Sequence, residues 1–387
     1  MALELPEYGL SEESLEFRDT LRRFFEEASP TTEVRRVIEK TRDGHAPELW
    51  RMASEELGLA GIAIAEDLGG QGFGLKELGI ALGEAGRTLA PIPLFATAGL
   101  AARVVAAVAG DRAGPALGRI ARGEAATFAW VESDGDWDPA ATRLTAEGEG
   151  EEARLEGAKH FVLGAAAARH LYVLAREPGS HCDEGLSLFH VDAEEEGVRV
   201  ETQKSVDLTR PVATIHFDGA RARAVGPRGE AASGVRVGLD EAAALLAAEM
   251  EGGMRKVLEV AVDYAAERHQ FSRPIGSFQA IKHKCADLLI DYEAARTASH
   301  AALVGHDDGD PERYLLSSVA QAQLSPSYVR MATESGQIQG GVGYTWEYDA
   351  HLYFRRALAC RALFGDESVH RDRLTRMVAN DSLGERA

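Results

Sequence analysis

The sequence predicts a mainly α-helical protein with a β-rich domain in its middle. Two observations lead to this fold class. Apolar residues recur at helical spacing toward both ends of the chain, and short segments rich in β-branched and aromatic residues fill residues 125–220. With 387 residues, 45% of them hydrophobic, the chain can bury a substantial core. We expect three domains: helical over 1–118, β over 119–232, and helical over 233–387.

Composition narrows the classes of function. The net charge of -20 disfavours nucleic acid and anionic membranes as partners, because both repel an acidic surface. Cys182, Cys285 and Cys360 show no metal-ligand spacing, so we expect neither a zinc or other metal site nor a disulfide framework. There is no basic region followed by an apolar run, and no apolar stretch of about 18 residues. A cytoplasmic enzyme is the expectation.

The first domain reads as a series of helices. Ser11 is a plausible N-cap for a helix over 10–28, and further helical patterns follow at 46–57, 75–88 and 94–109. Two of them are separated by the glycine-rich segment Leu68–Gly74. Glycines can cradle a phosphate, but this segment lacks the Lys-Ser/Thr of a P-loop. A turn between two helices is the favoured interpretation.

The middle region reads as several short strands separated by Gly, Asp and Pro. This spacing suggests a compact β-barrel or sandwich. The acidic, glycine-rich segment Glu147–Glu156 is interpreted as an exposed hairpin loop, because runs of charge usually lie in solvent. The expected strands are Thr127–Val131, His160–Val162, Leu171–Ala175, Leu186–Val191 and Ala213–Phe217.

The last domain contains a predicted helical hairpin. A periodic segment over Leu245–Arg268 is stopped by Pro274 and Gly276, and a second begins at about Phe278. We expect Arg268, Gln270 and Phe271 on the last turn of the first helix, and Gln279 on the first turn of the next. A guanidinium, two amides and a ring could hold an anionic, planar ligand. A polar cluster between helices is the alternative.

The amino-acid sequence of this hairpin resembles that of a known family. Arg268-His-Gln-Phe-Ser-Arg-Pro-Ile-Gly-Ser-Phe-Gln279 is similar to the C-terminal signature of acyl-CoA dehydrogenases. The segment Gln337–Tyr344, with Gly340 and Gly341, matches a second signature, although alone it would also suit a turn between helices. Three further segments resemble sequences typical of the family: Ala65–Gly72, Glu156–Val162 and Asp207–Arg210. The resemblance implies an N-terminal helical domain, a middle β-barrel and a C-terminal four-helix bundle.

The resemblance also implies an activity. Family members hold FAD at a subunit interface and remove two hydrogens across Cα and Cβ of an acyl-CoA thioester, with a glutamate taking the α-proton. An electron-transfer flavoprotein is then a possible further partner. The residues that match the family's FAD contacts are Arg268, Gln270, Phe271, Gln279, Gln337, Gly340 and Gly341.

The flavin-ring part of the pattern departs from the family. The loop Trp130–Trp137 keeps Glu132 but lacks the family's Gly-Ser-Asp, and Lys159-His-Phe161-Val-Leu163 stands where the family has Lys-x-Trp-Ile-Thr. An aromatic ring therefore remains at Phe161, while a hydroxyl donor is lost.

The catalytic glutamate also departs from its usual place. Phe364 stands at that position, with Asp366 and Glu367 close by. In some members the base lies on the helix before the hairpin, which makes Glu241 the best candidate here, with Glu249 further along. A glutamate that favours a helix N-terminus is the alternative reading of Glu241. Glu347 is another acidic candidate, although its family counterpart is structural.

The residues that match the family's contacts to the dinucleotide end of FAD are present, whereas the segments that would meet the flavin ring are altered. This combination is consistent with an FAD site shared between two subunits. Thr345-Trp-Glu-Tyr-Asp-Ala-His-Leu352 resembles bacterial steroid-degrading members whose two different subunits form heterotetramers and share FAD. We therefore predict one such subunit, paired with a paralogous chain and acting on a bulky acyl-CoA, such as one with a sterol side chain. A homotetramer that uses Glu241 and a non-catalytic scaffold are the two alternatives.

Overall fold

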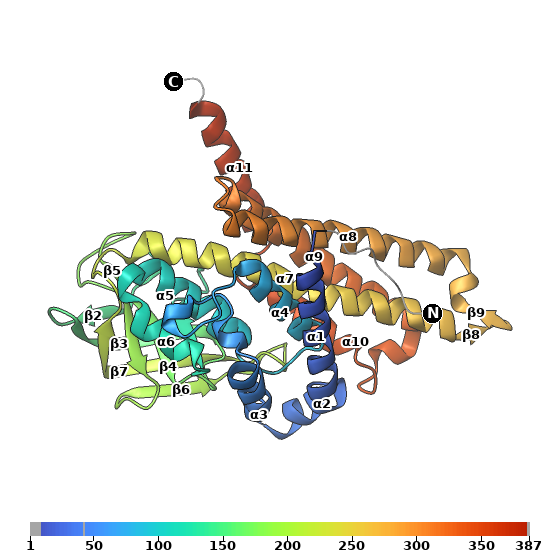
Figure 1. The fold of residues 1–387 in the computed structure, drawn as a ribbon, viewed down its shortest axis with the longest axis horizontal. Helices are drawn as coiled ribbons and strands as arrows, with labels where there is room; N and C mark the ends of the chain where they lie inside the picture. Colours follow the sequence, from blue (N-terminus) through green and yellow to red (C-terminus); the bar gives the residue numbers. More distant parts are fainter. Residues whose placement is uncertain (1–8, 42, 385–387) are drawn as a thin grey trace. The chain divides into compact units, whose positions relative to one another are not determined.

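The computed structural model describes residues 9–41 and 43–384, and side chains as far as residue 379 (Figure 1). The predicted fold class, helical with a central β region, is confirmed. The chain forms two compact units, and each is described by itself. One combines residues 1–35, 79–90 and 243–387, and the other combines 36–78 and 91–242. The three domain boundaries expected from the sequence stay a prediction.

The β region is a closed barrel. Its sheet has the order β1-β4-β2-β3-β7-β5, with β6 paired to β7, and an additional pairing of β5 with β4 closes the ring. The barrel core includes Leu155, Phe189 and Ile215, which are all fully buried. The strands are β1 (Ala126–Ala129), β2 (Thr145–Glu147), β3 (Glu152–Leu163), β4 (His170–Arg176), β5 (Leu186–Asp192), β6 (Val198–Thr202) and β7 (Val212–Ala224).

One expectation for this region was wrong in part. Glu147–Glu156 was predicted to be an exposed loop, but β3 already begins at Glu152. Ala153 and Leu155 alternate with charged neighbours and point into the barrel core, so only one face of this segment is exposed. Glu152, Arg154 and Glu156 lie on the outer face of β3, and residues 148–151 form the exposed turn before it.

Helices of the same unit include two π-helical stretches. The predicted segments 46–57 and 94–109 are helical, but each contains a π-helix, η1 (Met52–Glu56) and η4 (Phe95–Ala101). Thr97 in η4 bonds to β1, because its Oγ1 donates to the Ala126 carbonyl at 3.0 Å. The remaining helical elements are α3 (Pro47–Arg51), η2 (Leu59–Gly61), η3 (Glu66–Leu68), α5 (Ala102–Ala109), η5 (Gly110–Arg112), α6 (Gly114–Ala121) and η6 (Pro139–Ala141).

The other unit is built from long helices. Its first helix begins as predicted, since the Ser11 hydroxyl accepts a hydrogen bond from the Ser14 amide at 3.1 Å. The short helix α2 was not predicted, and residues 31–35 at its start belong to this unit. The helices are α1 (Glu12–Ala28), α2 (Thr31–Lys40), α4 (Leu75–Arg87), α7 (Ala231–Glu267), α8 (Gln279–Asp307), α9 (Arg313–Gln339), α10 (Ala350–Ala362) and α11 (Glu367–Gly384). Residues 75–78 of α4 and 231–242 of α7 belong to the barrel unit.

Helix α7 begins at Ala231, before the periodic segment Leu245–Arg268. Gly234 and Gly238 weaken the helical pattern in the sequence, but the fold needs both. A Cβ on Gly234 would lie 2.7 Å from the Ala107 carbonyl oxygen, and one on Gly238 would lie 2.6 Å from the Val104 Cα. These glycines let α7 lie directly against α5.

Helices α4 and α7 also touch through their backbones. A Cβ added to Gly252 would lie 1.8 Å from the Gly83 carbonyl oxygen. One added to Gly86 would lie 2.3 Å from the carbonyl oxygen of Glu249. Because backbone atoms of the facing helix stand where a Cβ would lie, only glycine fits at Gly86 and Gly252.

Candidate functional site

The connector between α7 and α8 is a β-hairpin rather than a continuation of the helix (Figure 1). Helix α7 ends at Glu267, and β8 (His269–Gln270) pairs with β9 (Arg273–Pro274). The prediction that Arg268, Gln270 and Phe271 lie on the last helical turn was therefore wrong. The two residues between the strands, Phe271 and Ser272, have φ of 54° and 61°. Positive φ at both positions is typical of a type I′ turn, which reverses the chain at once.

The turn presents an aromatic side chain to solvent. The Phe271 side chain is 87% exposed. Its ring meets Phe278 edge-on with centroids 6.1 Å apart, and the Arg273 guanidinium lies over the Phe278 ring at 4.0 Å. Gln279 is the first residue of α8, as predicted, and is exposed like Arg268 and Gln270. The predicted residues of this group thus share one accessible hairpin.

The second group of predicted contacts lies where α9 ends. Gly340 follows the helix with φ 70° and begins the short 3-10 helix η8 (Gly340–Tyr344). A Cβ on Gly343 would lie 2.7 Å from the Gly336 carbonyl oxygen, whereas a Cβ on Gly340 or Gly341 would meet nothing within 4 Å. Gly343 is therefore required by the packing of the chain itself. The open space over Gly341 leaves room for an external group to approach the backbone.

An exposed aromatic segment continues from these glycines. Val342, Tyr344, Trp346 and Tyr348 are all at least 36% exposed. Gln337 donates its side-chain amide to the Tyr344 hydroxyl, which links α9 to this segment. We had not predicted this surface, although four large apolar side chains at alternate positions are a visible signal in the sequence.

Arg35 and His351 hold the aromatic segment in place. Arg35 donates through Nη1 to the Trp346 carbonyl at 2.6 Å and through Nε to the Asp349 carboxylate at 2.8 Å. The Trp346 ring stacks on His351 with centroids 4.5 Å apart. Glu347, one of the acidic candidates, is exposed.

The candidate bases have different surroundings. Glu241 is half-buried in the interior of α7, ten positions after Ala231, so the reading of it as a helix N-terminal glutamate was wrong. The hairpin group begins with Arg268, after the last residue of α7. Glu241 lies in the interior of that helix and is therefore not part of the hairpin group. Glu249 is buried and pairs with Arg356, with Oε1 2.7 Å from Nη1.

The carboxylates near Phe364 serve the start of α11. Phe364 has φ 61° in the connection between α10 and α11. Asp366 caps α11, because its Oδ1 accepts from the amides of Ser368 at 2.9 Å and Val369 at 3.2 Å. Glu367 pairs with Arg361, and this hydrogen-bonded guanidinium lowers the pKa of the carboxyl. Both groups therefore have structural partners.

The middle loop that resembles the flavin-ring region is anchored by a buried ion pair. Lys159 has a fully buried side chain, and its Nζ donates to Glu132 Oε1 at 3.0 Å. Two residues later Phe161 has φ 55° and is 37% exposed. Phe161 lies at an irregularity in the pairing of β3 with β7, and its ring reaches 3.8 Å from the position of a Cβ on Gly135. The loop and Phe161 are thus neighbours.

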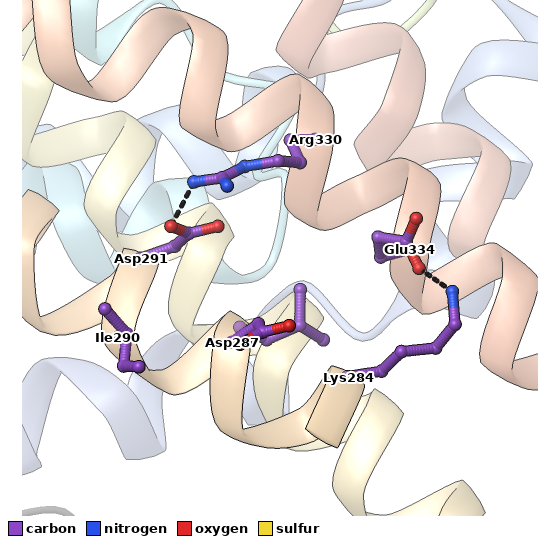
Figure 2. A pocket seen from close by; sticks show the side chains of 7 residues that line it. Lys284, Asp287, Ile290, Asp291, Arg330 and Glu334 are labelled. Carbon is purple, nitrogen blue, oxygen red and sulfur yellow. Dashed lines mark hydrogen bonds and ion pairs between the residues drawn. The ribbon is translucent and has the colours of Figure 1, made fainter. Parts of the chain in front are cut away.

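A separate groove lies between α8 and α9 (Figure 2). Its volume is about 360 Å³, and none of its lining residues belongs to the predicted site. Ion pairs of Lys284 with Glu334 and of Arg330 with Asp291 cross it, and Ile290 at its edge is 66% exposed.

Three family models match successive parts of the chain. They describe the N-terminal, middle and C-terminal domains of acyl-CoA dehydrogenases, and they match residues 11–114, 127–220 and 233–379. The chain belongs to the acyl-CoA dehydrogenase family. Members of this family are flavin-dependent oxidoreductases that act on acyl-CoA. The resemblance inferred from the signatures is therefore confirmed along nearly the whole sequence.

One curated relative matches most of this chain. The acyl-CoA dehydrogenase FadE34 of Mycobacterium tuberculosis is 32% identical over 355 residues, which cover 91% of this chain and 45% of FadE34. This chain thus spans about half the length of that relative.

Two solved structures resemble the fold closely. A variant of the Tcur3481–Tcur3483 steroid ACAD is 30% identical with a TM-score of 0.85, and covers 96% of this chain and 99% of its own. The ChsE4–ChsE5 complex from Mycobacterium tuberculosis is 26% identical with a TM-score of 0.84, and covers 97% and 99%. Within the described part of the chain, no helix combines the length and apolar character needed to cross a membrane.

Proposed function

We propose that this chain is one subunit of a heterotetrameric, FAD-dependent acyl-CoA dehydrogenase, in which it contributes the dinucleotide contacts of a shared FAD site. The substrate would be a bulky acyl-CoA, such as one with a steroid side chain. FAD would accept the hydride from Cβ of the thioester while a carboxylate removes the α-proton. A cytoplasmic location stays a prediction.

The exposure of Phe271 carries the proposal. A phenylalanine ring that is 87% exposed, on a turn with two non-glycine residues at positive φ, is unfavourable unless something covers it. A planar adenine system beside Phe271, with Arg268 available for a phosphate, would provide such a cover. The hairpin has the chemistry that the dinucleotide end of FAD requires.

The turn after α9 supports the same role. Gly341 is not required by the packing of this chain, since a Cβ there would meet nothing within 4 Å. A pyrophosphate that approaches the backbone closely would explain a glycine at this position. Gln337 and Gly340 flank the same space and would complete the contact.

The place of Phe364 favours a shared site over a self-sufficient one. A hydrocarbon cannot take a proton, and the nearby Asp366 and Glu367 cap α11 and bind Arg361. The base in the proposed assembly therefore comes from the paralogous partner. The name of the ChsE4–ChsE5 complex, a similar structure made of two different chains, supports such a pairing.

Flavin absorbance with and without a co-expressed paralogue tests the proposal. We expect a colourless chain alone, and a yellow, dye-reducing complex with the partner. In that complex, Phe271→Ala should remove most of the flavin while the fold persists, and Ile290→Ala, at another exposed apolar side chain, should keep it. If no pairing ever binds flavin, the proposal fails.

Two alternatives remain, and each has its own signature. A yellow, active protein from this chain alone, inactivated by Glu241→Gln, would indicate a homotetramer with its own base. The complex could also bind flavin and keep its full activity after Phe271→Ala and after substitution of every acidic candidate in this chain. That result would indicate a non-catalytic scaffold. An electron-transfer flavoprotein as acceptor is part of the main proposal, and would be tested by its reduction with the loaded complex.

A further inference from the structure

Helix α11 buries little of its surface within its own unit. Among residues 367–379, only the side chain of His370 is buried. Figure 1 shows α11 extending away from α8 and α9 after this first turn. Helices of this length are marginally stable in water unless one face packs against another surface. Most of the described surface of α11 is therefore available for contact with a second molecule.

One face of α11 combines a cation with two apolar side chains. Arg371, Leu374 and Val378 follow each other at spacings of three and four residues, which places them on the same side of the helix. Arg371 is exposed, Leu374 is half-buried and Val378 is 57% exposed. Exposed apolar side chains next to charged ones are typical of protein interaction surfaces.

The charge of α11 is opposite to that of the chain as a whole. Residues 368–379 contain three arginines and one aspartate, whereas the whole chain has a net charge of -20. A cationic segment is attracted to acidic surfaces, and another copy of this chain provides such surfaces. We therefore expect the surface that receives α11 to carry carboxylates.

The groove between α8 and α9 has this character (Figure 2). Three carboxylates and two cations line it, so one carboxylate is in excess. The cations pair with Asp291 and Glu334, whereas Asp287 is exposed at the edge of the groove. Burial raises the pKa of the Asp291 carboxyl, and the charge of Asp287 raises it further, against the attraction of Arg330. The excess negative charge of the groove therefore lies at Asp287.

The α8 edge of this groove has the same spacing as the α11 face. Asp287, Ile290 and Ala294 are all exposed and follow each other at three and four residues, and Ile290 is 66% exposed. The order of the spacings matches when two helices run parallel, and is reversed when they run antiparallel. In the parallel arrangement each side chain meets a complementary one: Arg371 with Asp287, Leu374 with Ile290, and Val378 with the small Ala294.

We propose that α11 of one copy of this chain docks along the α8 edge of the groove in a second copy. The apolar side chains supply the buried area, and the pair of Arg371 with Asp287 sets the register. Because each copy carries both surfaces, two copies exchange their α11 helices around a twofold axis. In the proposed heterotetramer this contact joins the two copies of this chain, but it does not depend on flavin binding.

Charge reversal on either side of the contact tests the inference. Arg371→Asp and Asp287→Arg each place like charges opposite one another, and each should raise the dissociation constant of the wild-type dimer about tenfold or more. Arg376→Asp is the matched control. It makes the same charge change on another side of α11, so it should alter dimerisation little. Sedimentation velocity of the full chain over a range of concentrations measures all four proteins.

An equimolar mixture of the two reversed variants separates this contact from misfolding. In the mixture each α11 again meets a groove of opposite charge, so association should return to nearly the wild-type strength. A monomeric wild-type chain would overturn the inference, as would single variants that dimerise normally or a mixture that stays dissociated. Binding of the paralogous chain in place of a second copy, abolished by Asp287→Arg, would also overturn it and assign the groove to that partner.

Discussion

Arg356 and Glu249 form a buried ion pair between α10 and α7, with Nη1 and Oε1 2.7 Å apart and both side chains less than 10% exposed. The pair lies next to the glycine contact of α4 with α7, because a Cβ on Gly86 would meet the Glu249 carbonyl oxygen. Glu249 is therefore part of the bundle's internal structure, which explains why an acidic residue on this helix need not be catalytic.

Removing one partner of this pair should destabilise the protein strongly. Arg356→Met leaves a buried carboxylate without its cation, and we expect the free energy of unfolding to fall by roughly 3 to 5 kcal/mol. The double substitution Arg356→Met with Glu249→Leu should lose less than Arg356→Met alone. Urea unfolding of the three proteins measures the difference, and a double variant as unstable as the single one would contradict this account.

The hairpin turn should tolerate glycine better than serine. Ser272 has φ 61°, where a side chain costs about 1 kcal/mol and glycine costs nothing sterically. We expect Ser272→Gly to raise the free energy of unfolding by up to about 1 kcal/mol. Ser277→Gly, five residues later, should lower it instead, because the Ser277 hydroxyl donates to the Pro274 carbonyl at 2.7 Å. Thermal unfolding of both variants measures the two changes in stability. Equal changes would contradict backbone strain at Ser272.

Mild acid should destabilise the protein through the buried His370 and the half-buried His190. Burial lowers the pKa of His190 to about 4, and it lowers the pKa of His370 to about 4 as well. Between pH 6.5 and 4 the unfolded chain binds protons at these rings and the folded chain does not, so stability is present above pH 6.5 and is lost as pH falls toward 4.

For each ring the loss should reach about 3 kcal/mol at pH 4. Urea unfolding at pH 7 and pH 5 gives the slope in the wild type and in His370→Gln. A smaller slope in His370→Gln supports the assignment. An identical slope would show that His370 is not involved.

The buried Lys159 should give a pH dependence of the same sign in alkali. Burial lowers its pKa to about 8, against the attraction of Glu132. Between pH 8 and 10.5 the unfolded chain keeps a proton that the folded chain has released, so wild-type stability should rise relative to Lys159→Met over this range. The gain should approach about 3 kcal/mol. A stability difference that stays constant from pH 8 to 10 would exclude this shift.

The elements that the sequence predicted correctly depend on local chemistry. The Ser11 cap, the helices at both ends and the first residue of α8 follow from capping residues and apolar spacing. The hairpin at Phe271 could not be predicted, because neither Phe271 nor Ser272 is the glycine or asparagine that normally signals positive φ. The early start of α7 was missed for a related reason, since Gly234 and Gly238 are explained only by a distant helix.

Some residues of the candidate site could likewise be predicted from local sequence, and others could not. The signatures around Arg268 and Gly341 are contiguous in sequence, so their residues could be named without a structure. The ion pair of Lys159 with Glu132 depends on burial inside the barrel, which neighbouring residues do not encode. Phe364 stands where the resemblance places the proton acceptor, so the identity of that residue stays a prediction.

The contact of Gly83 with Gly252 has a consequence for sequence variation. Where helices meet through side chains, a larger residue on one helix can be offset by a smaller one on the other. A Cβ on Gly252 would meet the backbone of Gly83, so no change of side chain on α4 can compensate for a substitution at Gly252. In a library of single and double variants, Gly252 should accept nothing but glycine, whatever residue stands at position 83.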